Sequence, residues 1–171
     1  MELRADEIET PIGELRIAMS GPLLVALGFA EGWNTLEAWL KRRFGPPTFQ
    51  PEDDPDGVTS ALAAYFRGEM EALDAIPLDP GGTPFQRKVW IAVRKVKAGR
   101  TTTYAQIAAK IGSPDAVRAV GGANRVNPIA IVIPCHRVVG SKGALTGYGG
   151  GIERKRWLLE HESRHTFHLE P

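Results

Sequence analysis

The sequence lacks most of the features that would place a protein in a membrane or in an oxidising compartment. Its 171 residues include one cysteine, Cys135, so neither an internal disulfide nor a zinc site with several cysteines can form. No apolar run approaches the roughly 20 residues that cross a bilayer. The first ten residues, MELRADEIET, are acidic and polar, whereas a secretory signal begins basic and continues apolar. We therefore expect a cytoplasmic protein whose only thiol chemistry takes place at Cys135.

Acidic and basic side chains are unevenly distributed along the chain. Residues 1–80 hold 6 Lys and Arg against 15 Asp and Glu, a net charge of −9. Residues 81–160 hold 14 against 3, a net charge of +11. This asymmetry predicts an anion-binding second half, for which a nucleic-acid phosphate backbone is the obvious polyanion. Charge alone leaves open that the basic residues only gather on one solvated face.

The first half has the pattern of short strands followed by helices. Three β-compatible runs separated by turn sequences predict an antiparallel meander; they are residues 7–10, 14–19 and 23–29. Asn34 is a candidate cap for a helix over 35–44, and a second helix is expected over 58–67. The proline-rich acidic stretch 45–56 is predicted to be a connector.

The composition of the sequence changes from acidic to basic near LDPGG. We predict an N-terminal domain over 1–76 with an acidic surface, a linker over 77–82 and a C-terminal domain over 83–171. The second domain opens with a capping box, Thr83 and Gln86, ahead of a helix that reaches about residue 98.

A second capping box, Thr103 and Gln106, opens a short helix that Gly112 ends. A third helix is expected from Ser113 toward Arg125. Two short helices joined by a tight glycine-containing turn are typical of a helix-turn-helix, although helix hairpins also occur in proteins that bind no DNA.

The third helix consists almost entirely of small residues, with Arg118 as its one large side chain in the run AVRAVGGA. Two adjacent glycines weaken a helix by roughly 1 kcal/mol each relative to alanine. The glycines could leave room for tight packing against a neighbouring helix. Alternatively, a smooth surface could approach a minor groove closely, with Arg118 projecting from it.

Cys135 lies between Pro134 and the pair His136-Arg137. A nearby base or positive charge can lower the pKa of a thiol, and the thiolate is the reactive form. Adjacent side chains of an extended chain point to opposite sides, so His136 could act on the cysteine only through a turn or a water molecule. The local sequence also allows a buried, inert cysteine beside a surface histidine.

A long run extends these observations: RAVGGANRVNPIAIVIPCHRVVGSKGALTGYGGGIERKRWLLEHE. It resembles the O6-alkylguanine-DNA alkyltransferases, also called methylated-DNA–protein-cysteine methyltransferases. The resemblance covers about Thr83 to Glu162 and includes the PCHRV signature, the RAVGGA helix, an Asn-Pro pair and the closing WLLEHE. It implies an α+β fold, with a small ribonuclease-H-like N-terminal domain containing an antiparallel sheet. The C-terminal domain would be mainly helical, with a winged helix-turn-helix.

The resemblance implies a chemical role for each matching residue. Cys135 would accept an alkyl group from O6 of guanine in one irreversible step. His136 would act as a base through a water molecule, oriented by Glu162. Asn127 would brace the turn that presents the cysteine, and Tyr104 would donate a proton to the departing guanine.

The resemblance also implies how DNA is held. Arg118 would enter the base stack where the flipped guanine has left. Further DNA contacts are expected at Ser113, Ala116, Ala119, Gly122 and Ala123. The base pocket would be lined by Val138, Tyr148 and Gly149, with Gly147–Gly151 as a mobile wall. Extrusion is needed because the alkyl carbon of a stacked pair cannot meet a thiolate within the duplex.

Some relatives carry a zinc site built partly from cysteines, which this chain cannot form, and we expect neither a metal nor another cofactor. The expected partner is double-stranded DNA with O6-alkylguanine or O4-alkylthymine, bound by a monomer that could be cooperative along DNA. His161, His165 and His168 have spacings compatible with a metal, but a polar tail is the simpler interpretation. Two other functions stay open: a non-catalytic sensor of alkylated DNA and a cysteine hydrolase.

Overall fold

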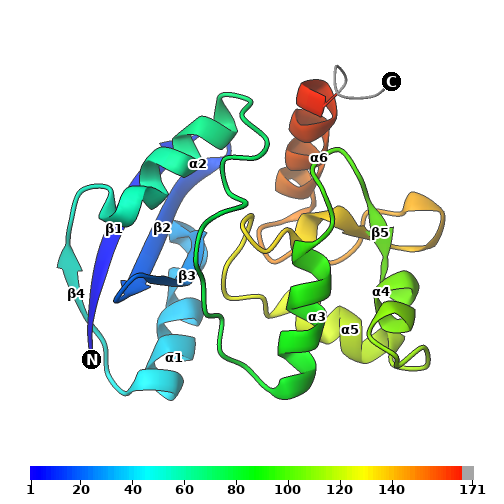
Figure 1. The fold of residues 1–171 in the computed structure, drawn as a ribbon, viewed down its shortest axis with the longest axis horizontal. Helices are drawn as coiled ribbons and strands as arrows, with labels where there is room; N and C mark the ends of the chain where they lie inside the picture. Colours follow the sequence, from blue (N-terminus) through cyan, green and yellow to red (C-terminus); the bar gives the residue numbers. More distant parts are fainter. Residues whose placement is uncertain (167–171) are drawn as a thin grey trace. The chain divides into compact units, whose positions relative to one another are not determined.

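The computed structural model describes residues 1–166, which form an α+β chain of two compact units (Figure 1). Unit 1 comprises Met1–Gly81 together with Pro128–Ala130. Unit 2 comprises Gly82–Asn127 and the chain from Ile131 onward. The expected α+β fold class is confirmed. None of the helices in the described part of the chain has the length and apolar character needed to span a membrane.

A four-stranded sheet in the order β3-β2-β1-β4 forms the centre of unit 1. Its strands are β1 (Glu2–Thr10), β2 (Gly13–Ser20), β3 (Leu23–Phe29) and β4 (Thr48–Pro51). The antiparallel meander of β1, β2 and β3 is confirmed. The connector predicted over 45–56 is wrong at 48–51, because this segment pairs in parallel with β1 and Phe49 packs against the hydrophobic core.

Two helices pack on this sheet, α1 (Trp33–Phe44) against β3 and α2 (Val58–Phe66) against β1. The predicted Asn34 cap is wrong. A 3₁₀ turn, η1 (Ala30–Gly32), leads directly into α1, so the chain is already helical at Asn34. A second 3₁₀ turn, η2 (Pro55–Gly57), precedes α2.

The free edge of β3 binds a segment from much later in the chain. The Leu27 N–H donates to the Pro128 carbonyl over 2.9 Å, and the Ala130 N–H donates to the Leu27 carbonyl over 3.0 Å. These two bonds explain why Pro128–Ala130 belong to unit 1, although the chain on either side belongs to unit 2.

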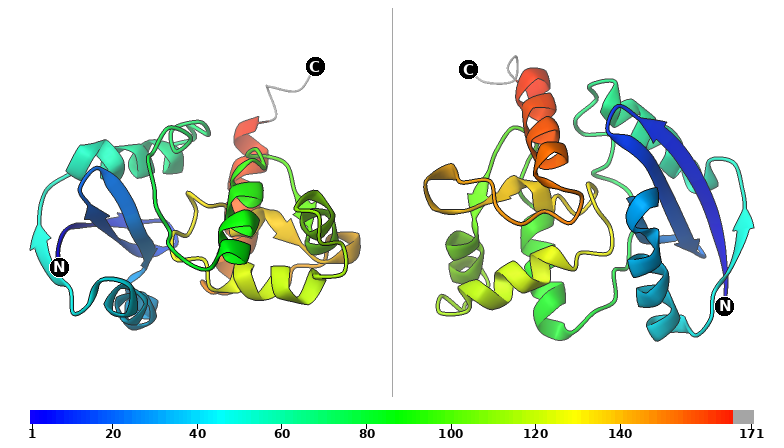
Figure 2. Two further views of the ribbon diagram at one scale, coloured as in Figure 1. Left: turned by 60° about the horizontal axis from the view of Figure 1, so that its bottom comes forward. Right: turned by 180° about the vertical axis from the view of Figure 1, so that it is seen from behind.

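Unit 2 is mainly helical (Figure 2). Its helices are α3 (Pro84–Arg94), α4 (Tyr104–Lys110), α5 (Val117–Arg125) and α6 (Ile152–Thr166). The first three pack against one another. Both predicted capping boxes are confirmed, since Thr83 and Gln86 bond reciprocally at α3, and Thr103 and Gln106 do so at α4.

Two predicted helix boundaries are wrong. The first helix ends at Arg94 instead of residue 98, because Lys95 and Val96 donate to carbonyls three residues back and tighten the last turn. The third helix begins at Val117 instead of Ser113, because the Ala116 N–H closes a turn on the Ser113 carbonyl. Pro114 lies within that turn.

Short elements connect α5 to α6. They are η3 (Cys135–Arg137), β6 (Val138–Val139) and η4 (Ser141–Gly143). β6 pairs in parallel with β5 (Thr102–Thr103), directly before α4. This ladder places the residues after the cysteine beside the first helix of the helix-turn-helix.

Candidate active site

Cys135 begins a 3₁₀ turn that follows directly on a proline. Pro134 has φ −80° and ψ 64°, and the Cys135 N–H donates to the Ile133 carbonyl over 2.7 Å. This is the geometry of an inverse γ-turn. Upstream, Ile131 has φ +68°, a conformation that costs a β-branched residue about 1–3 kcal/mol and that clusters at functional sites. The chain at Cys135 is therefore a turn, one of the two arrangements that the sequence left open.

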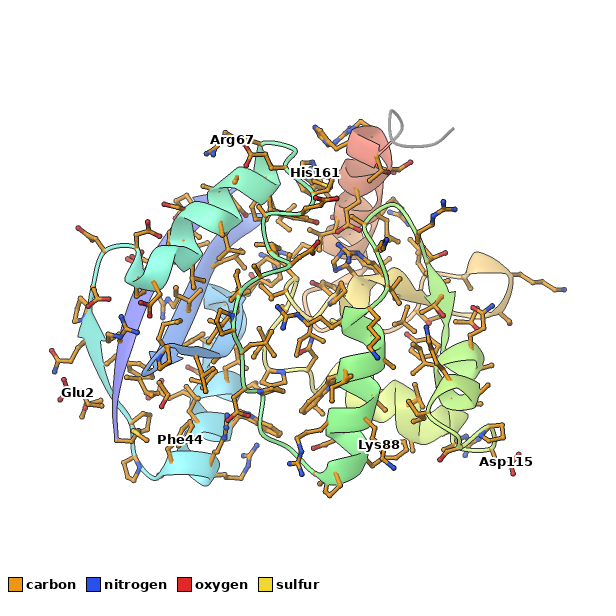
Figure 3. All side chains as sticks on the ribbon, in the orientation of Figure 1. Glu2, Phe44, Arg67, Lys88, Asp115 and His161 are labelled. Atoms are coloured by element: carbon orange, nitrogen blue, oxygen red, sulfur yellow. The ribbon has the colours of Figure 1, made fainter. Side chains whose placement is uncertain are left out.

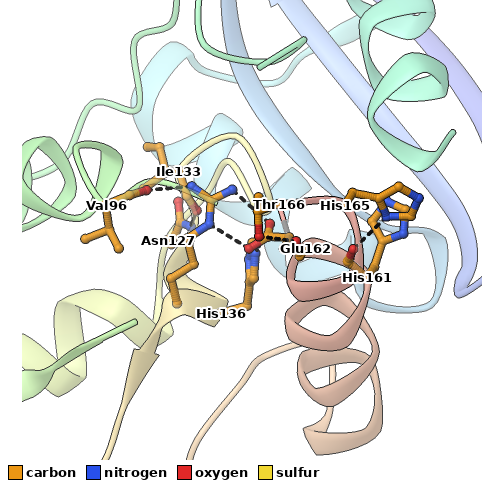
Figure 4. A network of polar contacts seen from close by, with 9 residues as sticks. Val96, Asn127, Ile133, His136, His161, Glu162, His165 and Thr166 are labelled. Atoms are coloured by element: carbon orange, nitrogen blue, oxygen red, sulfur yellow. Dashed lines mark hydrogen bonds and ion pairs between the residues drawn. The ribbon is translucent and has the colours of Figure 1, made fainter. Parts of the chain in front are cut away.

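A buried polar cluster joins Glu162 to His136 and Arg137, the two residues that follow Cys135 in the chain (Figure 4). The Glu162 carboxylate is within 2.7 Å of His136 Nε2. It also accepts two hydrogen bonds of 2.8 Å from Arg137, one to each oxygen. Arg137 donates a further hydrogen bond of 2.6 Å to the Val96 carbonyl, beyond the end of α3. Glu162 on α6 therefore holds both His136 and Arg137 of the PCHR sequence.

The electrostatics of this cluster define the state of the histidine. Burial lowers the pKa of His136 and outweighs the opposing effect of Glu162, so the imidazole is neutral near pH 7. Burial raises the pKa of Glu162, but His136 and Arg137 together hold it well below its usual range. A carboxylate at Nε2 requires the proton on that nitrogen, which leaves Nδ1 as an acceptor. Nδ1 is buried and has no hydrogen-bond partner within residues 1–166.

The Cys135 thiol is itself buried, with 6% of the residue exposed. Burial raises its pKa, whereas a hydrogen bond from the Asn127 side chain and the charge of Lys155 lower it. The Asn127 amide also donates to the Ile133 carbonyl over 2.8 Å, just before the γ-turn. The predicted brace at Asn127 thus lies against both the thiol and the turn.

Lys155 is a site residue that the sequence did not reveal. It is fully buried on α6, and its ammonium group donates to the carbonyls of Val138 and Thr146 over 2.7 and 2.8 Å. Burial lowers the pKa of this lysine, and the Cys135 thiolate opposes that shift. Lys155, Leu158 and Glu162 are all buried at helical spacing. A lysine at a core position of an amphipathic helix is the signal that could have identified it.

Two of the predicted pocket residues, Val138 and Tyr148, lie in the same region. Val138 is buried, and the Tyr148 ring lies edge-on to His136 at 6.5 Å between centroids. Burial raises the pKa of Tyr148 well above its usual value, and its hydroxyl has no partner within residues 1–166. Gly149 is exposed. The Tyr104 hydroxyl donates to the Thr146 carbonyl over 3.3 Å, the same carbonyl that Lys155 binds.

The residues predicted to contact DNA lie on helix α5 and in the turn that precedes it. Arg118 and Ala119 are exposed, and Ser113, Ala116 and Gly122 are partly exposed. Ala123 differs, because its side chain is buried and its carbonyl accepts a hydrogen bond of 2.9 Å from Trp90. We therefore leave Ala123 out of the candidate surface. Figure 3 labels Lys88 on α3 and Asp115 in the turn that precedes α5.

The glycines of α5 are not required by packing. A Cβ atom at Gly122 would meet nothing within 4 Å, and one at Gly121 would meet only Tyr104, at 3.9 Å. The sequence left open that they make room for a neighbouring helix. Within the described chain, no protein atom approaches closely enough to need that room.

His161 and His165 lie on α6, and the expected polar tail is wrong for both. His161 is buried and stacks on Trp157 at 4.7 Å between ring centroids, and His165 bonds the His161 carbonyl. His168 lies outside the described residues. Within residues 1–166 no group of three His, Cys, Asp or Glu side chains is arranged to hold a metal.

Two family models match successive parts of this chain. Residues 84–164 match the DNA binding domain of the 6-O-methylguanine DNA methyltransferases, and residues 4–80 match their ribonuclease-like domain. A methylated-DNA–protein-cysteine methyltransferase of Shigella flexneri is 50% identical over 165 residues, which cover 95% of this chain and 96% of that protein. The corresponding protein of Salmonella typhimurium is 41% identical over the same shares.

Solved structures are similar over nearly the whole chain. A variant of the Mycobacterium tuberculosis O6-methylguanine methyltransferase superposes with a TM-score of 0.81 at 44% identity, covering 95% of this chain and 94% of that one. The Mycobacterium tuberculosis protein in complex with DNA also gives 0.81, at 43% identity, covering 96% and 94%. The chain therefore belongs to the 6-O-methylguanine DNA methyltransferase family.

Proposed function

We propose that this protein repairs DNA by transferring the alkyl group of O6-alkylguanine irreversibly to its own Cys135. The observation that carries the proposal is the polar chain around the buried thiol. A neutral histidine is held by a carboxylate on one side, with its free nitrogen buried beside the cysteine turn. This arrangement suits a base that accepts a thiol proton and is stabilised by Glu162 once it is charged.

The nucleophile is formed by removing one proton. His136 Nδ1 accepts the thiol proton through a bridging water molecule, and the resulting imidazolium lies against the Glu162 carboxylate. The thiolate keeps two stabilising neighbours, the Asn127 amide and the Lys155 ammonium group. Because the site is buried, each of these interactions is stronger than it would be in water.

Transfer is a displacement at carbon. The sulfur–carbon bond forms as the bond between carbon and O6 breaks, and the electron pair of the broken bond remains on guanine. Tyr104 donates a proton to the departing base and regains one from solvent, while the imidazolium of His136 releases its proton to solvent, so the proton removed from the thiol is balanced by the one gained at guanine. The product is a neutral thioether with no hydrolytic route back, so one protein molecule repairs one lesion. The step requires neither a metal nor a soluble alkyl donor.

Access to the alkyl carbon requires the nucleotide to leave the stack, which costs a few kcal/mol and less for a weakened pair. We assign α5 to the DNA groove, with Arg118 replacing the flipped base. The open space at Gly122 and the single loose contact at Gly121, with Tyr104 at 3.9 Å, support this assignment, since no closer atom of residues 1–166 fills that space. The base pocket would lie between Val138, Tyr148 and Gly149. The lesion could be O6-alkylguanine or O4-alkylthymine, bound by a monomer.

The test is to mix the protein with duplex DNA containing O6-methylguanine under reducing conditions and to weigh the intact protein. We expect one methyl group per molecule, located on Cys135, and none on the Cys135→Ser variant. Tight lesion binding without a methyl adduct would overturn the proposal in favour of a non-catalytic sensor. Several lesions repaired per molecule would overturn the single-turnover mechanism.

A further inference from the structure

A second asparagine holds the cysteine turn, and the proposed chemistry does not use it. Asn124 lies on α5 with 3% of the residue exposed. Its amide Nδ2 donates to the Cys135 carbonyl over 3.3 Å. Its Oδ1 is buried and has no hydrogen-bond partner within residues 1–166.

The contact fixes the peptide that follows the nucleophile. The Cys135 carbonyl also accepts the Val138 N–H that closes η3, so two donors hold it. Asn127 holds the Ile133 carbonyl on the other side of Pro134. The orientation of the carbonyl depends on ψ of Cys135, and the direction of the Cα–Cβ bond is coupled to it. The two asparagines therefore set where the sulfur points.

A purely structural role does not account for Asn124. Its unpaired Oδ1 carries the desolvation cost of a buried acceptor, which an apolar side chain would avoid. The Cys135 carbonyl would remain bonded to Val138 without it. The buried amide therefore costs the folded protein stability. Within residues 1–166, the interaction that it provides in return is the hydrogen bond to the Cys135 carbonyl.

Asn124 also belongs to the helix assigned to DNA. Arg118 lies six residues earlier on α5, which is about 9 Å along the helix axis and about 120° around it. Arg118 is exposed, at the end of α5 assigned to the DNA groove. Asn124 is buried, at the end of the same helix that contacts the Cys135 turn.

We propose that Asn124 is a positioning residue that couples the DNA-bound helix α5 to the direction of the Cys135 sulfur. The proposal rests on the proposed alkyl transfer. It predicts that Asn124 affects alignment with the flipped base and not the acidity of the thiol, whose neighbours are Asn127 and Lys155.

The test compares Asn124→Ala and the nearly isosteric, uncharged Asn124→Leu with the wild type. Val120→Ala is the matched control, because Val120 is buried on the same helix and also loses side-chain volume. Four quantities are measured: melting temperature, affinity for unmodified duplex, single-turnover methyl transfer at saturating lesion DNA, and the pH midpoint of Cys135 alkylation by iodoacetamide.

We expect both Asn124 variants to transfer methyl about tenfold more slowly or worse, as misaligned reacting atoms do. Their affinity for duplex and their iodoacetamide midpoint should match the wild type, and Val120→Ala should keep its transfer rate. Normal transfer by both variants, a shifted midpoint, or a loss that Val120→Ala reproduces would overturn the proposal. If the wild type itself forms no adduct, the proposed function fails first and this inference falls with it.

Discussion

At the scale of single residues, the reactivity of Cys135 depends on groups that offset its burial. Removing a thiol from water raises its pKa and disfavours the thiolate that must attack carbon. The Asn127 amide and the Lys155 ammonium group act in the opposite direction, and His136 is the proposed acceptor of the thiol proton. Arg137 contributes less charge to the thiol than its position in the sequence suggests, since Glu162 binds it on both oxygens.

Replacing Lys155 with methionine keeps the length of the side chain and removes the charge. A positive charge favours the thiolate, so its loss should raise the pKa of Cys135 further. Methyl transfer near pH 7 should slow by about tenfold for each unit of that rise. The measurement is the pH profile of iodoacetamide alkylation, which should move to higher pH.

Arg156→Met is the control for Lys155→Met, because Arg156 is exposed on the same helix. It should leave the profile in place. A Lys155→Met profile that superposes on the wild type would show that the ammonium group does not act on the thiol. Melting temperatures of both variants separate this effect from a loss of fold, since the carbonyls of Val138 and Thr146 lose a donor.

The sequence predicts the cysteine and the histidine of the candidate site but not the lysine, for a physical reason. Cys135 and His136 are adjacent in the chain, and the PCHRV signature marks both. Lys155 acts from 20 residues away, and its importance comes from burial, which is a property of the folded chain. The same holds for Asn124, whose partner is the carbonyl of Cys135 rather than a neighbour in sequence.

At the scale of elements, features that are set locally were predictable and those that depend on distant pairing were not. The capping boxes at Thr83 and Thr103 involve residues three apart, and both are present. Strand β4 contains one large apolar residue, Phe49, and is a strand only because β1 pairs with it. The early end of α3 frees the Val96 carbonyl for Arg137, a partner 41 residues later.

Helix α5 offers a test of the trade-off between stability and DNA binding. Gly122 is within the helix and has open space around it, so Gly122→Ala should stabilise the protein by about 0.5–1 kcal/mol. The same methyl group would lie on the surface assigned to the groove, so affinity for duplex DNA should fall. Urea unfolding and fluorescence anisotropy measure the two effects.

A matched control for Gly122→Ala is Ser163→Ala, an exposed position on α6 where alanine also improves helix propensity. It should gain stability and keep its affinity for DNA. If Gly122→Ala binds DNA as tightly as the wild type, this part of α5 does not approach the groove closely, and the two glycines remain without an assigned role.

At the scale of the whole molecule, the charge distribution predicts the main division between the two units but not the segment Pro128–Ala130, which groups with unit 1. The change from acidic to basic composition near residue 80 coincides with the division between the two units. The grouping of Pro128–Ala130 with unit 1 has no such signal, because it rests on two backbone hydrogen bonds to Leu27. Composition reports where charge is concentrated, but backbone pairing over 100 residues leaves no local pattern in the sequence.

The buried cluster of His136 and Glu162 predicts how the stability of the protein depends on pH. Burial lowers the pKa of His136 in the folded state, so below the usual histidine pKa of about 6.5 the unfolded chain binds a proton that the folded protein refuses. The free energy of unfolding should therefore fall on acidification from pH 7.5 to 5.5, by up to about 1.4 kcal/mol per pH unit for this one group. The pKa of Glu162 is also lowered, and its contribution is present above the usual glutamate pKa near 4.5 and is lost as the pH falls further.

Urea unfolding at several pH values measures this dependence, with His136→Gln and His165→Gln compared with the wild type. His165 is exposed, so His165→Gln should retain the fall between pH 7.5 and 5.5. His136→Gln should lose the part that arises from the buried imidazole. A wild-type protein whose stability is constant or rises on acidification over this range would contradict a neutral His136. It would thereby also remove the base on which the proposed alkyl transfer depends, because only a neutral imidazole can accept the thiol proton.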